Sequence, residues 1–334
     1  MLHASWASQA IGVAAELGLP DLLRDGPRTS DDLAAAARAH APSLHRLLRA
    51  LTTIDICREC ADGAFELTDT GALLSTDHPH SLRSWVIWWT RYLWPVWGNL
   101  LYSVKTGKSA RAMLLGTEGF AHLADNPASA STFNRALAEI TRTVAEEIVA
   151  GIDFSLFALI VDVGGGEGEL LCHILRECPR ARGILFDLPH AVEGARLRMA
   201  REGLAARCEC VSGDFFRSLP RNGGAYLLKS VLHDWDDNRA SELLSVCRSA
   251  MSEDSVLVVI ERVLPDHLRP SRQHRAVARG DLTMLVAHAA RERTEAELRS
   301  LLSDAGFAIR RMVTTEGSLG VIEAVPLRIE RSLA

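Results

Sequence analysis

The stretch Val161-Asp162-Val163-Gly164-Gly165-Gly166-Glu167-Gly168-Glu169 decides the fold class of this chain. An apolar run meets a cluster of glycines here, which predicts a buried strand that turns tightly into a helix. Gly164 and Gly166 match the dinucleotide-binding pattern G-x-G-x-x-G, but Glu169 occupies the position of its last glycine. No phosphate-binding G-x-x-x-x-G-K-S/T segment occurs. Because Glu167 and Glu169 would repel a pyrophosphate, the loop favours a ligand that has positive charge and no phosphate.

Four further short apolar runs follow this segment, and helical stretches separate them. The runs are 184–186, 208–211, 225–228 and 256–260. Strands that alternate with helices predict an α/β fold, with a mostly parallel sheet covered by helices on both faces. Ligands of such sheets bind at the carboxyl ends of the strands. The polar residues at those ends are therefore the candidate site residues.

Two of these strand ends carry residues that suit a nucleoside. Asp187 ends the second strand, 23 positions after Gly164, where a carboxylate can accept hydrogen bonds from both ribose hydroxyls. The segment Gly213-Asp214-Phe215 closes the third strand, with an acceptor for an adenine amino group and a ring to pack on the base. Turns and helix caps alone would also explain these residues. Their occurrence at successive strand ends favours a cofactor site.

The first half of the chain reads as helical. We expect one helix over 11–23, a second over 30–37 capped by Ser30-Asp31-Asp32, and a third that begins at Ser43. Two short extended pieces, 56–59 and 64–67, then surround Asp62-Gly63, so that the outline is that of a winged helix. A band of tryptophans follows, and a long helix is expected over 129–150. The domain boundary falls near Ala150-Gly151.

The composition bounds the function classes. The 334 residues are 48% hydrophobic and 24% charged, as in a soluble protein with a core, and the net charge of −5 gives no electrostatic case for nucleic acid or an anionic membrane. No apolar run has the length of a membrane span, and residues 1–17 lack the pattern of a signal peptide, so we expect a cytoplasmic protein. The seven scattered cysteines complete no zinc pattern, so we expect reduced thiols and no metal.

Together these motifs resemble the S-adenosylmethionine-dependent small-molecule O-methyltransferases, of the plant caffeate and isoflavone type and its bacterial natural-product branch. The resemblance covers nearly the whole chain. It is carried by residues 161–168, 186–190, 213–216, 228–235 and 291–294. It implies a Rossmann-like methyltransferase sheet behind an N-terminal, mainly α, winged-helix-like dimerisation domain. The implied domains are a dimerisation domain over 1–100, a helical connection over 101–150 that contributes to the substrate pocket, and a catalytic domain over 151–334 that binds S-adenosylmethionine.

The resemblance also implies a role for each matching residue. His233 is the general base, Asp234 lies beside it, and Glu261 and Glu292 orient it. The implied cofactor-binding residues are Asp162, Gly164, Gly165, Gly166, Asp187, Leu188, Gly213, Asp214, Phe215 and Lys229. The first half forms an intertwined homodimer and contributes to the acceptor pocket, for which the candidates are Trp88, Phe133, Leu137, Ile140 and Met284. The chain departs from the family at Ala289-Ala290, where two glycines are usual, so the loop before Glu292 is expected to be shaped differently.

A histidine suits the chemistry that this reading requires. A phenol has a pKa of about 10 and is scarcely ionised near neutrality, whereas an imidazole with a pKa of about 6.5 can take its proton. A carboxylate on the other ring nitrogen would fix the tautomer. Other readings remain: His233 as a surface residue at a helix that starts near Asp236, Glu261 in a salt bridge with an arginine, and Glu292 as an exposed acid at a helix start.

The leading hypothesis is an O-methyltransferase that acts on a hydroxylated, aromatic natural-product intermediate. Transfer to carbon, nitrogen or sulfur, or a repurposed relative that transfers no methyl group, is the alternative on the same scaffold. The tryptophan band, which includes Trp85, Trp88 and Trp89, belongs either to a core or dimer interface or to the substrate cover. A winged-helix transcription regulator is a remote alternative, because the first 150 residues are slightly acidic. A pseudo-enzyme that only binds the cofactor is another.

Overall fold

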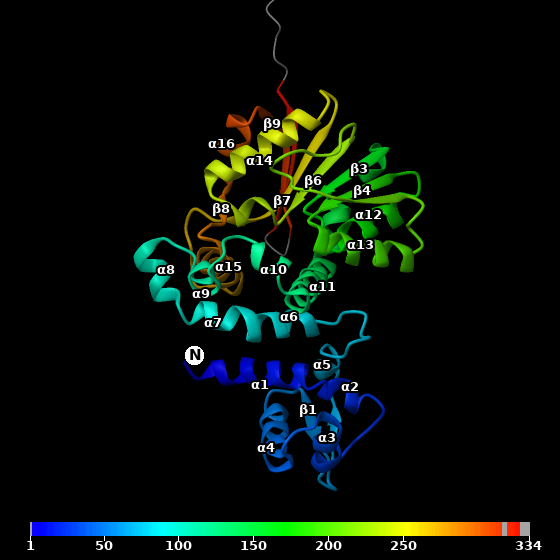
Figure 1. The fold of residues 1–334 in the computed structure, drawn as a ribbon, viewed down its shortest axis with the longest axis vertical. Helices are drawn as coiled ribbons and strands as arrows, with labels where there is room; N and C mark the ends of the chain where they lie inside the picture. The colour runs from blue at the N-terminus through cyan, green and yellow to red at the C-terminus, as the bar shows by residue number, and fades with distance from the viewer. Residues whose placement is uncertain (1, 316–318, 328–334) are drawn as a thin grey trace, which may run out of the picture. The chain divides into compact units, whose positions relative to one another are not determined.

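The computed structural model describes residues 2–315 and 319–327. The chain divides into two compact units, which Figure 1 shows in ribbon form. The first unit comprises the described residues up to 95 together with 135–143, and the second comprises 96–134 and the described residues from 144 onward. Each unit is described by itself.

The first unit is mainly helical and contains one small antiparallel hairpin, as predicted. Its elements are η1 (Leu2–Ala4), α1 (Ser5–Glu16), α2 (Leu19–Leu23), α3 (Ser30–Ala37), α4 (Ala41–Thr52), β1 (Cys57–Glu59), β2 (Phe65–Leu67), α5 (Asp69–Ala72), α6 (Arg83–Ile87) and η2 (Trp88–Leu93). The single helix predicted over 11–23 is wrong. Gly18 adopts φ 66°, a left-handed conformation that favours glycine, and this ends α1 before α2 begins.

The predicted cap of one helix and the predicted start of another also differ from the structure. The cap of α3 is Thr29, whose side chain accepts a hydrogen bond from the Asp32 backbone N–H. Helix α4 begins at Ala41 after His40, with Pro42 in its first turn, and makes no cap through Ser43. Proline suits the first turn of a helix because the backbone N–H that it lacks would have no partner there. Both predicted helices therefore exist. Helix α3 covers the predicted residues but has another cap, and only the start of α4 was misassigned.

The tryptophan band has several environments. Trp88 is buried and stacks on Tyr92 with ring centroids 4.9 Å apart, both within the π-helical stretch η2. Trp85 and Trp89 pack on each other at 5.9 Å. Trp94, by contrast, is partly exposed. Part of the band therefore belongs to the packing of the first unit, while its role toward an acceptor remains a prediction.

The second unit holds the sheet, together with the helices that lead to it and cover it. It contains half of α7 (Trp94–Trp97), most of α11 (Pro127–Gly151), and all of α8 (Leu100–Thr106), α9 (Ala110–Leu115), α10 (Ala121–Ala124), η3 (Phe154–Leu156), α12 (Glu169–Glu177), α13 (Pro189–Arg201), η4 (Leu232–Asp234), α14 (Asp237–Ala250), α15 (Arg272–His288) and α16 (Glu295–Asp304). Its strands are β3 (Leu159–Val163), β4 (Arg182–Asp187), β5 (Cys208–Ser212), β6 (Ala225–Lys229), β7 (Val256–Leu264), β8 (Arg293–Thr294), β9 (Phe307–Thr314) and β10 (Leu319–Pro326).

The sheet confirms the predicted fold class. Its order is β5-β4-β3-β6-β7-β10-β9, and β8 pairs with β7. All five predicted strands are present, and β3 to β7 pair in parallel. The antiparallel strands β9 and β10 at the far end of the sheet were not predicted. The carboxyl ends of β3, β4, β5 and β6 therefore meet at one edge.

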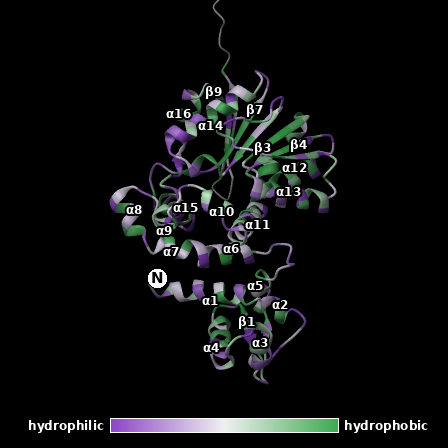
Figure 2. Cartoon of the chain, viewed as in Figure 1, coloured by the Kyte–Doolittle hydropathy of each residue, from purple (hydrophilic) through white to green (hydrophobic). Residues whose placement is uncertain are grey.

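Each face of the sheet has its own core, because successive strand residues point to opposite sides. One core joins the sheet to the end of α11 and to α12 and α13 through Ile160, Leu227, Val258, Ile148, Leu171 and Ala195. The other joins it to α14 and α16 through Val161, Leu228, Val259, Leu244, Cys247 and Leu302. Figure 2 shows the central strands as the hydrophobic interior of this arrangement.

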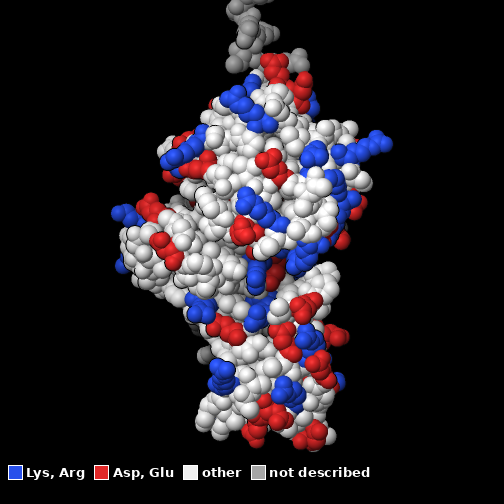
Figure 3. Space-filling model, turned by 45° about the vertical axis from the view of Figure 1, so that its right-hand side comes forward, with Lys and Arg blue, Asp and Glu red and all other residues white. Residues whose placement is uncertain are grey.

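Two further observations concern the surface. On the face drawn in Figure 3, acidic and basic side chains lie interspersed, in keeping with a net charge of only −5. Among the residues that the structure describes, no helix combines the length and the apolar composition needed to cross a membrane.

Candidate functional site

The glycine loop lies between β3 and α12 and is held from β4. Asp187, the last residue of β4, accepts hydrogen bonds from the backbone N–H of Gly166 through Oδ2 (2.8 Å) and from that of Leu188 through Oδ1 (2.6 Å). Burial raises the pKa of Asp187, which these two donors partly offset. A carboxylate oxygen can accept more than one hydrogen bond, so Asp187 can fix the loop and still receive a ligand hydroxyl.

A buried carboxylate lies directly beneath this loop. Asp162 is 2% exposed, and a Cβ placed on Gly165 would approach its Oδ2 to 2.6 Å, so no larger residue fits there. Among the described residues, Oδ2 has no hydrogen-bond partner. Burial and the nearby Asp187 raise the pKa of Asp162 to about 7, against the charge of Lys229. An unpartnered buried acid at a glycine loop fits a ligand that brings a cationic donor, as the ammonium of S-adenosylmethionine does.

The structure corrects the interpretation of the two loop glutamates. Arg198 of α13 forms ion pairs with Glu167 (3.2 Å) and Glu169 (2.6 Å), and His173 lies 3.3 Å from Glu169. Both carboxylates therefore have a cationic partner within the protein, and these ion pairs tie the loop to α13. Asp162 is therefore a better partner than Glu167 or Glu169 for the cationic ligand that the sequence indicated.

The third strand end brings an aromatic ring to the same loop. A Cβ on Gly164 would lie 3.7 Å from the Phe215 ring, and one on Gly213 would collide with Phe186 at 2.4 Å. Asp214 Oδ1 accepts a hydrogen bond from the Phe216 backbone N–H at 2.9 Å. The structure thus places the predicted nucleoside residues of β4 and β5 next to the glycine loop.

The predicted catalytic residues come together from the segment after β6, from within β7 and from the residue before β8. His233 is in η4, directly after β6, and its Nδ1 lies 3.1 Å from Glu292 Oε2 and 3.6 Å from Glu261 Oε2. Its Nε2 lies 3.6 Å from Asp234 Oδ1. Both glutamates are 2% exposed, so the reading of Glu292 as an exposed acid does not hold. Glu261 faces His233 in this arrangement. The helix that follows starts at Asp237 with Asp236 as its cap, so His233 does not cap it.

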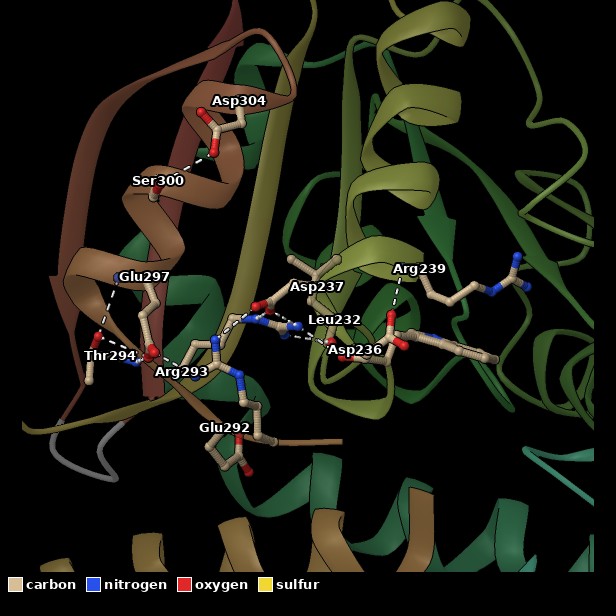
Figure 4. A network of polar contacts seen from close by, with 12 residues as sticks. Leu232, Asp236, Asp237, Arg239, Glu292, Arg293, Thr294, Glu297, Ser300 and Asp304 are labelled. Carbon is tan, nitrogen blue, oxygen red and sulfur yellow. Dashed lines mark hydrogen bonds and ion pairs between the residues drawn. The ribbon is translucent and has the colours of Figure 1, made fainter. Parts of the chain in front are cut away.

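The loop that carries His233 is fixed by its backbone as well. Glu261 Oε1 accepts hydrogen bonds from the N–H groups of Val231 (3.0 Å) and Leu232 (2.7 Å). Arg293, which the sequence analysis did not single out, is 3% exposed and donates to the carbonyls of Leu232 and Trp235, each at 2.8 Å. Figure 4 shows Arg293 reaching this loop from the segment that also holds Glu292. Arg293 therefore connects the loop that carries His233 to the segment that carries Glu292.

The start of α16 holds Arg293 and Glu292 in place. Thr294 caps this helix and exchanges hydrogen bonds with Glu297, which forms a capping box (Figure 4). On the other side, Ala289 ends α15 in a left-handed conformation with φ 55°. The unusual Ala289-Ala290 pair therefore adopts a turn that glycine favours, and Glu292 still reaches His233.

The carboxylates set the protonation of the imidazole. Burial alone would lower the pKa of His233, but the charges of Glu261, Glu292 and Asp234 outweigh it and raise the pKa to about 10. Burial raises the pKa of Glu261 to about 7 and that of Asp234 to about 6, with the His233 charge opposing in both cases. Lys229 lies between the two sites: burial lowers its pKa to about 8, and Glu261 and Asp162 oppose the change. With its pKa raised to about 10, His233 is protonated near neutrality.

We expect kcat/KM for a phenolic acceptor to rise roughly tenfold per pH unit between about pH 7 and pH 9. In this range His233 carries a proton in the free enzyme and a phenol with a pKa of about 10 carries another, so one must leave before the pair can react. Initial rates at low acceptor concentration and constant ionic strength measure this. A profile that levels off above about pH 6.5, the pKa of an ordinary imidazole, would contradict the raised value.

The five predicted acceptor residues are divided between the units. Trp88, Leu137 and Ile140 belong to the first, and Phe133 and Met284 to the second. Phe133 packs on Phe120 with ring centroids 5.8 Å apart. An acceptor pocket that combines all five residues remains a prediction.

Comparison with family models gives two matches that together span most of the chain. Residues 97–308 match the O-methyltransferase domain, and residues 1–77 match the O-methyltransferase dimerisation domain.

Curated relatives match nearly from end to end. The chain is 40% identical to phenazine O-methyltransferase of Lysobacter antibioticus, over 98% of this chain and 95% of that protein. It is 36% identical to the O-demethylpuromycin-O-methyltransferase of Streptomyces alboniger, over 96% and 86%. It is also 35% identical, over 88% and 85%, to 8-amino-8-demethylriboflavin N,N-dimethyltransferase of Streptomyces davaonensis.

Solved structures agree with these matches. The crystal structure of LaPhzM superposes with a TM-score of 0.94 at 40% identity, over 98% of this chain and 97% of that one. An O-methyltransferase from neocarzinostatin biosynthesis, solved with S-adenosylmethionine and 2-hydroxy-5-methyl naphthoic acid, superposes with a TM-score of 0.82 at 32% identity, over 96% of each chain.

Proposed function

Since this chain belongs to the S-adenosylmethionine-dependent O-methyltransferase family, we propose that it methylates a hydroxyl group of a small aromatic natural-product intermediate, with His233 as the general base. The observation that carries the proposal is the contact of His233 with Glu292 and Glu261 at the strand ends, beside the glycine loop. The aromatic part is supported by relatives whose names specify acceptors such as a phenazine or 3-amino-4-hydroxybenzoate.

Different residues would bind the cofactor and the acceptor, at two neighbouring sites. Asp162 would hold the cationic end of the cofactor, Asp187 its ribose, and Phe215 its adenine. When bound, S-adenosylmethionine supplies an electrophilic methyl group on a sulfonium. Lys229 lies between Asp162 and Glu261, so its charge offsets acids on both sides.

His233 takes the proton of the acceptor hydroxyl in the second site. With Nδ1 facing Glu292, its Nε2 is the nitrogen that faces the acceptor and Asp234. A pKa of about 10 matches that of a phenol, so the proton moves between partners of similar affinity. Glu261 and Glu292 then stabilise the imidazolium. General-base catalysis of this kind contributes about 10²–10⁴-fold.

The direct test is methyl transfer itself. The full-length protein is incubated with S-adenosylmethionine and a panel of phenols, naphthols and hydroxyphenazines, together with the matching aromatic amines. Mass spectrometry detects methylated products, and NMR distinguishes O-methyl from N-methyl groups. Methylation of amines alone would favour the alternative of N-methyl transfer, which the 35% identity to the riboflavin N,N-dimethyltransferase motivates.

We further expect a homodimer in solution. The match of residues 1–77 to the dimerisation domain supports this. Large apolar side chains are exposed on two segments of the second unit, at Leu101 and Val104 of α8 and at Leu114 and Leu115 of α9. Exposed apolar groups of this extent are typical of an interface. Light scattering at micromolar concentration should give twice the chain mass of 36.5 kDa, and Leu101→Asp with Val104→Asp should lower it. A wild-type monomer at that concentration would contradict the expectation.

A further inference from the structure

A buried arginine lies near the base and has no part in the mechanism above. Arg111 of α9 is 5% exposed. Burial lowers the pKa of its guanidinium to about 10, and the charge of Asp234 opposes the change. Removing a guanidinium from water is costly unless anionic or hydrogen-bonding groups compensate. The buried charge of Arg111 therefore acts on any charged group that lies in this part of the site.

A chain of contacts connects Arg111 to His233. Asp234 Oδ1 lies 3.5 Å from His288 Nε2, and the same nitrogen lies 3.2 Å from Arg111 Nη1. Burial, and then the charge of Arg111, lower the pKa of His288 well below its ordinary value, so this ring is neutral and accepts from the guanidinium. With the 3.6 Å step from Asp234 to His233, the contacts place Nη1 within about 10 Å of His233 Nε2.

Aromatic rings surround this chain of polar groups. The Phe120 ring centroid lies 4.9 Å from that of His288, 6.2 Å from that of Trp235 and 5.8 Å from that of Phe133. One polar atom of the same region, Trp235 Nε1, is buried and has no hydrogen-bond partner in the described part of the chain. Flat apolar surfaces with a buried donor are what a planar, polar-substituted ligand requires. All these residues belong to the second unit.

We propose that Arg111 binds a carboxylate on the aromatic acceptor, so that the enzyme selects hydroxyarene carboxylates over their neutral analogues. This rests on the proposed function, since the ring then lies between the guanidinium and His233. The planar guanidinium matches a carboxylate in two-point hydrogen bonding, and its five N–H groups can serve an imidazole and an anion together. The contacts above bound the distance from Arg111 Nη1 to His233 Nε2 at about 10 Å, which one or two fused rings can span. Its positive charge also offsets Asp234, which would otherwise repel an anionic acceptor.

The test compares matched acid and amide ligands. 3-Hydroxybenzoate is paired with 3-hydroxybenzamide, and 6-hydroxy-2-naphthoate with 6-hydroxy-2-naphthamide. Their affinities are measured by calorimetry in the presence of S-adenosylhomocysteine, for the wild type, Arg111→Gln and Arg111→Lys. Arg299→Gln, which removes an exposed guanidinium paired with Glu295 on α16, is the matched control.

The wild type and the control should bind at least one acid about 10- to 150-fold more tightly than its amide, the range for a hydrogen bond to a charged group. Arg111→Gln should abolish this preference and leave amide affinity unchanged, and Arg111→Lys should keep part of it. If Arg111→Gln does not fold, the lysine variant decides, because full retention of the preference contradicts two-point binding. Equal affinity of the wild type for acid and amide, or binding of neither acid, overturns the proposal.

Binding is scored separately from methyl transfer. Arg111-dependent binding of an acid that is never methylated supports the anion site and contradicts the proposed function. Methylation of acids and amides at equal kcat/KM supports the proposed function and overturns the anion site.

Discussion

Replacement of His233 by alanine should lower kcat for a phenolic acceptor by about 10²–10⁴-fold while the affinity for S-adenosylhomocysteine stays near that of the wild type. The imidazole is the group that faces Asp234 through Nε2 and is oriented by Glu292 through Nδ1, so its loss leaves no base in that position. In the described part of the chain its ion pairs are with Asp234, Glu261 and Glu292 and not with the glycine loop, so cofactor binding should not change. Steady-state rates and calorimetry measure the two effects separately.

Two comparisons sharpen this result. His233→Gln keeps a polar side chain that takes no proton and should be nearly as slow, whereas His267→Ala, at an exposed histidine, should retain wild-type rates. The loss should shrink for nitrophenols, whose lower pKa lets them ionise without help. Full activity of His233→Ala toward an unactivated phenol would mean that the acceptor needs no general base.

Replacement of Asp187 by alanine should weaken cofactor binding about 10- to 150-fold, which corresponds to losing roughly 1.5–3 kcal/mol of hydrogen bonding to a charged group. The side chain is proposed to receive the ribose hydroxyls, and it also holds the N–H groups of Gly166 and Leu188. Both losses act in the same direction. Calorimetric titration with S-adenosylhomocysteine measures the change.

Asp254→Ala serves as the matched control, because this acid is exposed in the turn before β7. Thermal unfolding of both variants separates a local effect on the loop from general destabilisation. An unchanged cofactor affinity for a folded Asp187→Ala protein would show that the ribose lies elsewhere.

Much of the sheet could be predicted from sequence, because its strands are buried on both faces and read as continuous apolar runs. Strand β3 ends at Val163, where the glycine loop stops the apolar run, as predicted. Strands β9 and β10 were missed because polar residues interrupt them, as Arg310 and Arg311 do in β9. The helix over 11–23 failed at Gly18, where one left-handed residue outweighs the apolar pattern.

The candidate site, too, could be predicted from the sequence only in part. The residues at the ends of β3 to β6 were foreseeable, since parallel strands bring their carboxyl ends to one edge. The ion-pair and hydrogen-bond partners that come from distant segments could not be foreseen. Arg198 has the appearance of a surface residue in the sequence, yet it forms ion pairs with both loop glutamates. Nothing in the sequence indicated that Arg111 belongs to the site, because its partner His288 lies 177 positions away.

The hydrogen bonds from Arg293 to the His233 loop determine when the catalytic group can form during synthesis. Its hydrogen bonds to Leu232 and Trp235 span 61 and 58 positions, and Glu292 comes from the same late segment. Synthesis proceeds from the N-terminus, so a nascent chain that has emerged only as far as β7 already contains the glycine loop, Asp187 and His233. It lacks the arginine and the glutamate that fix the imidazole. Strand β10, which lies between β7 and β9, also arrives last. A ribosome-bound chain can thus complete its cofactor-binding strands well before it becomes a catalyst.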